Sequence, residues 1–293
     1  MNGYDYLGNP IPQGKVILIG AVLDAGSDAN RFKAMKQLLD IGVKKLQFPD
    51  AEIAADEFTY ASKGAVALLP QEPAMHQLHT PVALYAKNAD SKAEIASVTK
   101  VMSLVTGLDY AHDLEEVVAI KSADVRSGSG NYFSAGDTMT LREMMLAMML
   151  PSSNTAAWAF ARIVGAKVLE AQGDSAYTDT ECVTAFIAAM NAKAANAIGM
   201  TNPNFVYPDG GVATMTPAEL LRLIVEACSY PDICKVWGKK TYTIAVGGSN
   251  PRNVTLETTV TDAAIEAVYT ILGGKTGSMT NAKALVMAAE VAV

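Results

Sequence analysis

Three short polar motifs interrupt otherwise apolar segments, and they constrain this chain more than any other feature of its sequence. In chain order they are Ser97-Val98-Thr99-Lys100, Ser152-Ser153-Asn154 and Lys275-Thr276-Gly277. Alone, each is a common pattern: an exposed helix start, an N-cap cluster or a glycine-rich turn. Three chance occurrences in this order are much less probable than a single functional site that contains all three motifs. The fold is therefore expected to bring the three motifs together.

The first motif pairs a hydroxyl with an amine. Apolar residues recur at helical spacing after Lys100 and predict a helix that begins near Ser97. Residues at i and i+3 share a helix face, so Lys100 lies about one turn from Ser97. A serine hydroxyl is a poor nucleophile until a base takes its proton. A lysine can do so only if burial or nearby positive charge lowers its pKa.

The other two motifs carry groups that suit a peptide substrate. Ser152 and Asn154 lie in a polar loop between two apolar helices, where Ser152 can relay a proton and Asn154 can hold Lys100 and a substrate amide. Lys275 and its neighbouring hydroxyl can bind a terminal carboxylate. The glycine that ends the third motif lets a substrate backbone lie close to the strand.

Composition excludes several classes of function. The chain has 293 residues, half of them apolar, and a net charge of −7. An acidic chain without a basic stretch argues against nucleic acid and against an anionic membrane surface as partners. No apolar run approaches the roughly 18 residues of a membrane span. No signal peptide is recognised, so either the protein stays inside the cell or its export signal is not part of this sequence.

The cysteines and histidines give no sign of a metal site. His76, His79 and His112 lack metal-ligand spacing, and we expect the first two in a solvated loop. Cys228 and Cys234 could pair, but buried free thiols are favoured for both and for Cys182. We therefore expect no metal and no cofactor.

The distribution of strand and helix signals predicts two lobes within one domain over residues 1–293. Strand signals occur before residue 97 and after 235, and helix signals dominate between them. We expect an α/β lobe from about 1–96 and 236–293, a helical lobe from about 97–235, and the site between the two. The expected strands are 15–25, 64–69, 82–86, 241–246 and 284–293. The expected helices run from Asp28 to Gly42, from Ser97, from Thr140 to Pro151, over 183–198 and from Thr216, with 48–62 as a linker.

The sequence resembles the serine D-alanyl-D-alanine carboxypeptidases, the low-molecular-weight penicillin-binding proteins, over most of residues 60–293. Beyond the three motifs, the likeness includes 85–90 before the first motif, 135–141 and 149–157 around the second, and 190–194 after it. The resemblance implies a β-lactamase/transpeptidase-like fold, an antiparallel sheet flanked by helices with a helical insert. Where the family often has His-Gly, this chain has Asp209-Gly210.

The resemblance also implies roles for individual residues. By this likeness Ser97 is the nucleophile and Lys100 its base, while Ser152 and Asn154 assist proton transfer and substrate placement. The substrate-binding residues implied by the same likeness, which line the strand for the terminal D-alanine, are Lys275, Thr276, Gly277 and Ser278. The backbone N–H groups of Ser97 and Ser278 would form the oxyanion hole.

The order of the chain ends departs from the family. There, the third-motif strand leads through two more strands to a terminal helix, whereas this chain stops one strand after Ala282. Residues 16–23 resemble the family's last strand and 30–42 its last helix. We infer a circular permutation cut near Asn2-Gly3, a hairpin-turn dipeptide. We therefore expect 16–23 to pair antiparallel with 284–291, with a helix over 30–41 packed on the sheet.

The function implied is a serine acyl-enzyme hydrolase that removes the C-terminal D-alanine from peptidoglycan stem peptides and is acylated by penicillin. Its partners would be stem peptides and β-lactam antibiotics, its location the periplasm or cell wall, and no membrane anchor is expected in this chain. A serine β-lactamase shares the three motifs, but class A enzymes need a deacylating carboxylate, and no Glu-x-x-x-Asn occurs between Asn154 and Lys275. A non-catalytic penicillin- or peptidoglycan-binding protein is the other alternative, against which the intact Ser97 and Lys100 count.

Overall fold

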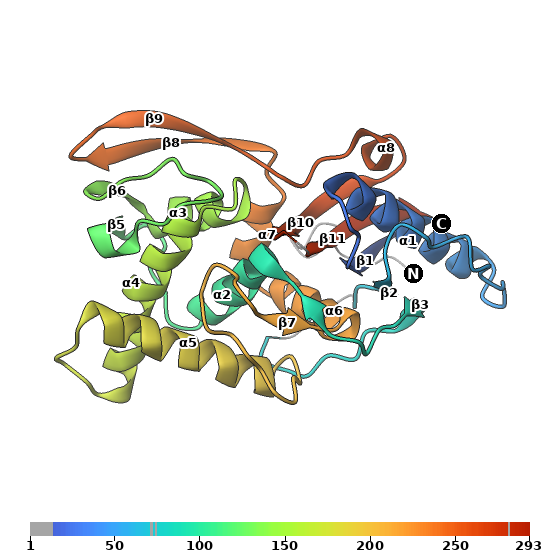
Figure 1. Cartoon of the computed structure of the whole chain (residues 1–293), viewed down its shortest axis with the longest axis horizontal. Helices are drawn as coiled ribbons and strands as arrows, with labels where there is room; N and C mark the ends of the chain where they lie inside the picture. Colours follow the sequence, from blue (N-terminus) through green and yellow to red (C-terminus); the bar gives the residue numbers. More distant parts are fainter. Residues whose placement is uncertain (1–13, 71–72, 74, 281) are drawn as a thin grey trace.

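A five-stranded antiparallel sheet forms the centre of one half of the molecule (Figure 1). The computed structural model describes residues 14–70, 73, 75–280 and 282–293, so Asn2-Gly3 lies outside the described residues. In spatial order the sheet contains β10 (Thr270–Ser278), β11 (Lys283–Ala292), β1 (Lys15–Leu23), β2 (Lys63–Leu68) and β3 (Ala83–Lys87). The helices are α1 (Asp28–Gln47), α2 (Thr99–Gly107), α3 (Leu141–Met149), α4 (Asn154–Gln172), α5 (Asp179–Asn196), α6 (Pro217–Cys228), α7 (Pro231–Trp237) and α8 (Ala263–Glu266).

The strand from the start of the chain lies in the middle of this sheet. β1 pairs antiparallel with β11, with Val16 opposite Val291 and Val22 opposite Leu285, which confirms the predicted pairing. On its other edge β1 pairs antiparallel with β2. Alternate β1 residues enter two different cores, Ile19 the core on the helical side and Leu18 the core under α1. Burial on both faces explains why every residue from 17 to 23 is apolar or glycine.

The helix predicted over 30–41 packs on the sheet as expected, but its bounds were wrong. Ser27, not Asp28, is the N-cap, because the Ser27 hydroxyl accepts from the Asn30 amide at 3.1 Å. Gly42 does not end the helix, which continues to Gln47. A Cβ at Gly42 would lie 2.7 Å from Leu18 Cδ1, so this glycine permits close packing of α1 on β1. It is a packing glycine inside a helix rather than a terminator.

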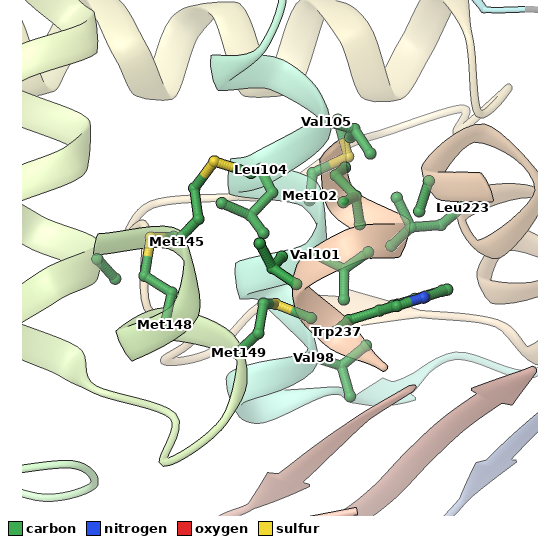
Figure 2. Close-up of a cluster of buried hydrophobic side chains, with 14 of the residues drawn as sticks. Val98, Val101, Met102, Leu104, Val105, Met145, Met148, Met149, Leu223 and Trp237 are labelled. Carbon is green, nitrogen blue, oxygen red and sulfur yellow. The ribbon is translucent and has the colours of Figure 1, made fainter. Parts of the chain in front are cut away.

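The helix that carries the first motif is enclosed by other helices. All nine residues of α2 are buried. Figure 2 shows its apolar side chains between methionines of α3, Leu223 of α6 and Trp237 of α7. Removing one such side chain to alanine typically costs about 2–5 kcal/mol of stability, so this packing fixes the position of α2. The first motif therefore sits on a rigid support.

The segment between residues 97 and 235 is mainly helical but also contains three short strands that the sequence analysis missed, β5 (Val117–Ala119), β6 (Asp137–Thr140) and β7 (Thr214–Met215). β5 and β6 form a four-stranded sheet with β8 (Thr241–Gly248), which was predicted over 241–246, and with β9 (Arg252–Glu257), while β7 pairs with β4 (Ala93–Glu94). β5 and β6 are too short to give a period-2 pattern. They pair with the β8–β9 hairpin, so a segment assigned to the α/β lobe extends the helical lobe instead.

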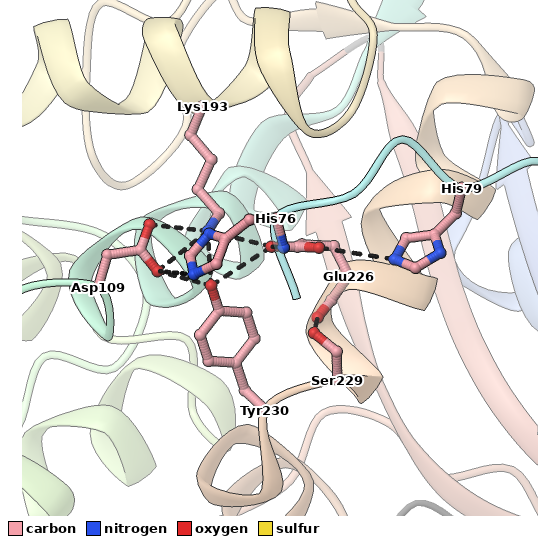
Figure 3. A network of polar contacts seen from close by, with 7 residues as sticks. All are labelled: His76, His79, Asp109, Lys193, Glu226, Ser229 and Tyr230. Atoms are coloured by element: carbon pink, nitrogen blue, oxygen red, sulfur yellow. Dashed lines mark hydrogen bonds and ion pairs between the residues drawn. The ribbon is translucent and has the colours of Figure 1, made fainter. Parts of the chain in front are cut away.

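A buried polar network lies outside the three motifs (Figure 3). Lys193 of α5 lies 2.8 Å from an Asp109 carboxylate oxygen and 3.0 Å from Glu226 of α6, and it donates to the Tyr230 hydroxyl at 2.5 Å. His79 Nε2 is 3.7 Å from Glu226, and the His79 side chain is only 11% exposed. The expectation of a solvated loop was therefore wrong for His79, because a buried carboxylate faces it.

Other expectations were confirmed or refined. The three cysteines are buried free thiols, as the sequence favoured. Residues 48–62 contain no helix or strand, as expected of a linker, yet Phe58 is almost fully buried in the core under α1. Within the described part of the chain, no helix is long and apolar enough to span a membrane.

Candidate active site

The first motif lies in a strained turn that leads into α2. Ser97 belongs to a one-turn 3-10 helix at Ala96–Val98, and Ala96 has a φ of 47°. A non-glycine residue in this region is uncommon and marks a backbone held by its surroundings. A Cβ on Gly210 would lie 2.9 Å from the Ala96 carbonyl carbon, so only glycine allows this approach. The turn brings Ser97 Oγ to 3.0 Å from Lys100 Nζ.

Lys100 is the centre of the polar contacts. Its ammonium group is within hydrogen-bond distance of Ser97 Oγ, and it donates to Asn154 Oδ1 at 2.9 Å and to the Asp209 carbonyl at 2.9 Å. Burial disfavours its charged form and lowers the pKa of Lys100 to about 7, although the Asp209 carboxylate acts in the opposite direction. A lysine with this pKa is about half neutral at pH 7, and the neutral form can accept a proton.

In the second motif, the middle side chain caps a helix and the two side chains beside it contact the site lysines. Ser153 is the N-cap of α4, and its hydroxyl accepts from the Ala156 amide at 3.2 Å. Ser152 adopts a φ of 64°, which turns it out of the helix path. Asn154 contacts Lys100 and donates through Nδ2 to the Ser127 carbonyl at 3.1 Å. The N-cap interpretation thus applies to Ser153 alone, while both its neighbours contact the site.

The third motif meets the second through its lysine. Lys275 Nζ donates to Ser152 Oγ at 2.8 Å and to the Thr276 carbonyl at 2.9 Å, and the residue is fully buried. Burial, together with the positive charges of Lys100 and Arg31, holds the pKa of Lys275 well below its ordinary value. The sequence analysis expected this cation to bind a carboxylate, but its amine faces Ser152.

Gly277 brings β10 against the nucleophile turn. A Cβ at this position would lie 2.1 Å from the Ile95 carbonyl oxygen, so no larger residue fits there. The Thr276 hydroxyl shares a 2.7 Å hydrogen bond with that of Thr259. All three motifs therefore converge, as their order in the sequence predicted: the first contacts the second through Asn154, and the second contacts the third through Ser152.

Arg31 is a site residue that sequence reasoning missed. From α1 it donates to the Gly277 carbonyl at 3.2 Å and to Ser278 Oγ at 2.6 Å. Its Nη1 also lies 3.0 Å from Asp28 Oδ1, with which it forms an ion pair. It shares the buried helix face with Met35 and Leu38. A cation on an apolar face needs polar partners, and this mismatch was the available signal. Arg31 therefore ties α1 to the end of β10 through hydrogen bonds.

Comparison with known proteins agrees with this geometry. The model of the D-alanyl-D-alanine carboxypeptidase family matches residues 74–292. The chain belongs to this family. Because the match begins after α1, the segment that holds β1 and α1 lies outside it.

Individual relatives support the same assignment. The chain is 33% identical to a D-alanyl-D-alanine endopeptidase of Pseudomonas aeruginosa over 52% of this chain and 46% of that protein. It is 30% identical to a D-alanyl-D-alanine carboxypeptidase of Streptomyces sp. strain K15 over 70% of each chain. A mutant structure of the Streptomyces K15 DD-transpeptidase superposes with a TM-score of 0.60 at 26% identity, covering 73% of this chain and 87% of that one. This carboxypeptidase-family chain thus spans about half the length of the first of these relatives.

Proposed function

We propose that this chain is a serine DD-peptidase that removes the C-terminal D-alanine from peptidoglycan stem peptides and is acylated by penicillin at Ser97. The observation that carries the proposal is the 3.0 Å approach of Lys100 Nζ to Ser97 Oγ, with the pKa of Lys100 lowered to about 7. A neutral amine at this distance can take the hydroxyl proton as oxygen attacks a carbonyl carbon.

Lys100 and Lys275 both take part in the acylation step. Ser97 Oγ forms a bond to the carbonyl carbon of the penultimate D-alanine, its proton passes to Lys100, and the N–H groups of Ser97 and Ser278 receive the oxyanion. The C–N bond then breaks, and the leaving D-alanine amine takes a proton from Ser152, which regains one from the protonated Lys100 while its hydroxyl accepts a hydrogen bond from Lys275 at 2.8 Å. A water molecule then attacks the ester, its proton passes through Lys100 to Ser97 Oγ, and the shortened peptide is released.

The substrate's terminal carboxylate is proposed to lie at the end of the third motif. The Thr276 hydroxyl and the Ser278 region offer donors, and Arg31 supplies positive charge behind Gly277 and Ser278. Lys275 contributes through its hydrogen bond to Ser152, since its amine is fully buried. The Asn154 side chain is proposed to hold the substrate amide as well as Lys100.

Peptide turnover tests this function directly. We expect release of D-alanine from an acylated D-alanyl-D-alanine peptide with a free C-terminus, and a sharp fall in kcat/KM when that C-terminus is amidated. The Ser97→Ala protein should release none. Equal turnover of the free and amidated peptides would remove the third motif and Arg31 from carboxylate binding, and release of D-alanine by Ser97→Ala would end the nucleophile assignment.

The β-lactamase alternative differs in the fate of the acyl-enzyme. Between Asn154 and Lys275 the chain has no Glu-x-x-x-Asn segment to activate a deacylating water. We therefore expect a penicilloyl-enzyme that persists, whereas rapid regeneration of free enzyme would favour a β-lactamase. The non-catalytic alternative would give no adduct with penicillin at all.

The circular permutation, the extent of the catalytic unit and the location are part of the same proposal. The β1–β11 pairing and the start of the family match at residue 74 support a permutation that places the family's last strand and helix first. We propose that residues 1–293 act as one catalytic domain of two lobes, with the expected bounds 1–96 and 236–293 for one and 97–235 for the other, except that the β8–β9 hairpin belongs with the helical lobe. Family membership supports action outside the cytoplasm, on the cell wall.

A further inference from the structure

Thr259 lies outside the three motifs, yet it contacts the third motif and the start of the second. It belongs to the segment that joins β9 to α8 (Figure 1). Its hydroxyl oxygen is 2.7 Å from that of Thr276 in the third motif. Its backbone amide donates at 3.1 Å to the carbonyl of Leu150, two residues before Ser152. Thr259 therefore links the two motifs by a second route, separate from the bond between Lys275 and Ser152.

The backbone on both sides of Thr259 is held in place. The Thr258 amide donates to the Lys240 carbonyl at 2.8 Å, and the Thr258 hydroxyl accepts from the Val260 amide at 3.1 Å. Val260 is buried in the core under α1, and a Cβ at Gly274 would lie 3.3 Å from Val260 Cγ1. Because a β-branched side chain also has few χ1 rotamers, the Thr259 hydroxyl has a defined position against β10.

The pair of hydroxyls on Thr259 and Thr276 keeps one proton for a ligand. Each hydroxyl has one proton and two lone pairs, and the bond between them uses a single proton. Among the described residues, neither hydroxyl makes a second hydrogen bond. Thr276 is 5% exposed and Thr259 is partly exposed, so a ligand can reach the pair. The remaining proton suits a ligand group that only accepts, such as a carboxylate.

The charges beside the pair favour an anion. Arg31 donates to the carbonyl and to the hydroxyl of the two residues that follow Thr276. Arg31 and Lys283 lie 3.0 and 3.6 Å from the same carboxylate oxygen of Asp28, whose side chain is 61% exposed. Two cations thus share one largely exposed carboxylate at this end of β10. Positive charge exceeds negative charge there.

We propose that Thr259 is a positioning residue for carboxylate specificity. Its hydroxyl donates to Thr276 Oγ1, and the Thr276 proton is thereby directed toward the C-terminal carboxylate of the substrate. The proposal rests on the proposed function for the identity of that substrate. Because Thr276 Oγ1 accepts one hydrogen bond while it donates another, the two bonds polarise each other and the bond to the anion is strengthened. Thr276 touches the substrate, and Thr259 acts through it.

Variants of Thr259 test this role by binding alone. Thr259→Val keeps the shape of the side chain and the backbone bond to Leu150 but removes the hydroxyl, and Thr259→Ser keeps the hydroxyl. Each is combined with Ser97→Ala and titrated by calorimetry with two peptides that end in D-alanyl-D-alanine and differ only in a free or amidated C-terminus. We expect the preference for the free acid to fall about threefold to tenfold in Thr259→Val, as loss of one hydrogen bond predicts, and to persist in Thr259→Ser.

A matched control exists in the same part of the chain. The hydroxyls of Thr243 and Thr255 form a similar bond at 3.0 Å on the exposed face of the β8–β9 hairpin. Thr255→Val should leave the preference for the free acid unchanged. Thr259→Ala, a second variant without the hydroxyl, should behave as Thr259→Val does.

A double-mutant cycle separates positioning from direct contact. If Thr259 acts only through Thr276, the Thr259→Val/Thr276→Val protein should show the same preference as Thr276→Val alone, because the shared bond is already lost. Losses that add would mean that Thr259 contacts the carboxylate by itself, and they would overturn the positioning role.

The remaining outcomes distinguish this role from the enzymatic function, with release of D-alanine by the wild type measured in parallel. A binding preference that Thr259→Val lowers and Thr255→Val keeps supports the positioning role, whether or not D-alanine is released. Absence of release with this binding pattern would refute the peptidase function alone. Equal binding of the two peptides by Ser97→Ala, an unchanged preference in Thr259→Val, or a lost preference in Thr259→Ser would overturn the proposal.

Discussion

At the scale of single residues, the proposed chemistry depends on an uncharged form of the buried Lys100. Lys100 is enclosed by α2 and its neighbours, and burial outweighs the opposing effect of Asp209 on its pKa. Lys275 adds a second buried amine whose pKa is lowered by burial and by Lys100. In the proposed mechanism these two buried amines contact two different serines, Lys100 acting on the Ser97 proton and Lys275 holding the Ser152 hydroxyl.

The pH dependence of acylation should report Lys100. Its folded pKa of about 7 means that the amine is protonated below this pH and neutral above it. We expect the rate of acylation by penicillin to fall about tenfold per pH unit below the inflection and to level off above it. Asp209→Asn should move the inflection to lower pH, because the carboxylate raises this pKa. A rate that is flat from about pH 5 to about pH 9 would assign the base elsewhere.

Replacing Lys100 tests the same base without changing pH. We expect Lys100→Ala to slow acylation by several orders of magnitude, because the Ser97 hydroxyl then lacks its proton acceptor. Stopped-flow or quenched mass measurements of adduct formation give the rate. An acylation rate equal to that of the wild type would show that another group serves as base.

Arg31 should affect the third motif from the opposite side of the strand. Arg31→Met removes the donors to the Gly277 carbonyl and to Ser278 Oγ. We expect kcat/KM for a peptide with a free C-terminus to fall about tenfold, as loss of a hydrogen bond to a charged group predicts. Lys33→Met, an exposed neighbour on α1, is the control. An Arg31→Met enzyme as active as the control would remove Arg31 from the site.

The motif residues could be predicted because their chemistry is local, whereas Arg31 could not. Ser97 and Lys100 are three residues apart, and any helix brings them together. Arg31 meets Gly277 only because α1 packs behind β10, a contact between segments far apart in the sequence. The burial of the Lys275 amine against Ser152 is likewise a tertiary property, which a Lys-Thr-Gly tripeptide does not reveal.

At the scale of elements, the arrangement of helices depends on polar as well as apolar contacts. Figure 3 shows Lys193 between the carboxylates of Asp109, which follows α2, and of Glu226 in α6. Burial, followed by the bond to Asp109, raises the pKa of Tyr230, which keeps its hydroxyl protonated as a donor. The network ties α5 and α6 to the segment that follows α2. Sequence patterns missed it because its members come from four separate segments.

Removing the cation from this network should destabilise the protein. Lys193→Met leaves Asp109 and Glu226 without their shared partner, and breaking a buried pair typically costs about 3–5 kcal/mol. Lys92→Met, at an exposed lysine, should change the free energy of unfolding by no more than about 0.5 kcal/mol. Urea unfolding of the two variants gives both values. Similar midpoints for the two would contradict a structural role for the network.

The element predictions succeeded where periodicity was long and failed where it was short or broken. β1 was recognisable from its uninterrupted apolar run, and its partner from the family order. β5 and β6, with three and four residues, carry no comparable signal. Gly42 was taken as a helix end because glycine usually terminates helices, but close packing on Leu18 requires it inside α1.

At the scale of the whole molecule, the sheet joins the two ends of the chain. β1 lies between β11 and β2, and the Val293 amide donates to the Gly14 carbonyl at 2.7 Å. β11 and β1 are thus neighbours without a covalent hairpin between them. Under the proposed permutation, the connection that passes from α1 to β2 through 48–62 takes the place of that hairpin.

Restoring the family order tests the permutation. A chain that begins at residue 63, continues to 292 and returns through a short turn to residues 15–47 has the same strand neighbours. Because the cut then falls in the irregular 48–62 segment, we expect it to fold and to bind penicillin at the wild-type rate. A rearranged chain that stays unfolded or inactive would mean that the present order is required.

The central claim is that Ser97 is the nucleophile of a penicillin-sensitive peptidase, and intact mass followed over time after mixing with penicillin tests it most directly. We predict that the wild-type protein gains the mass of one penicillin, that the adduct persists, and that peptide mapping places it on Ser97. Ser97→Ala should gain no mass under the same conditions. An adduct of the same mass on Ser97→Ala, or a wild-type protein that never gains it, would contradict the account.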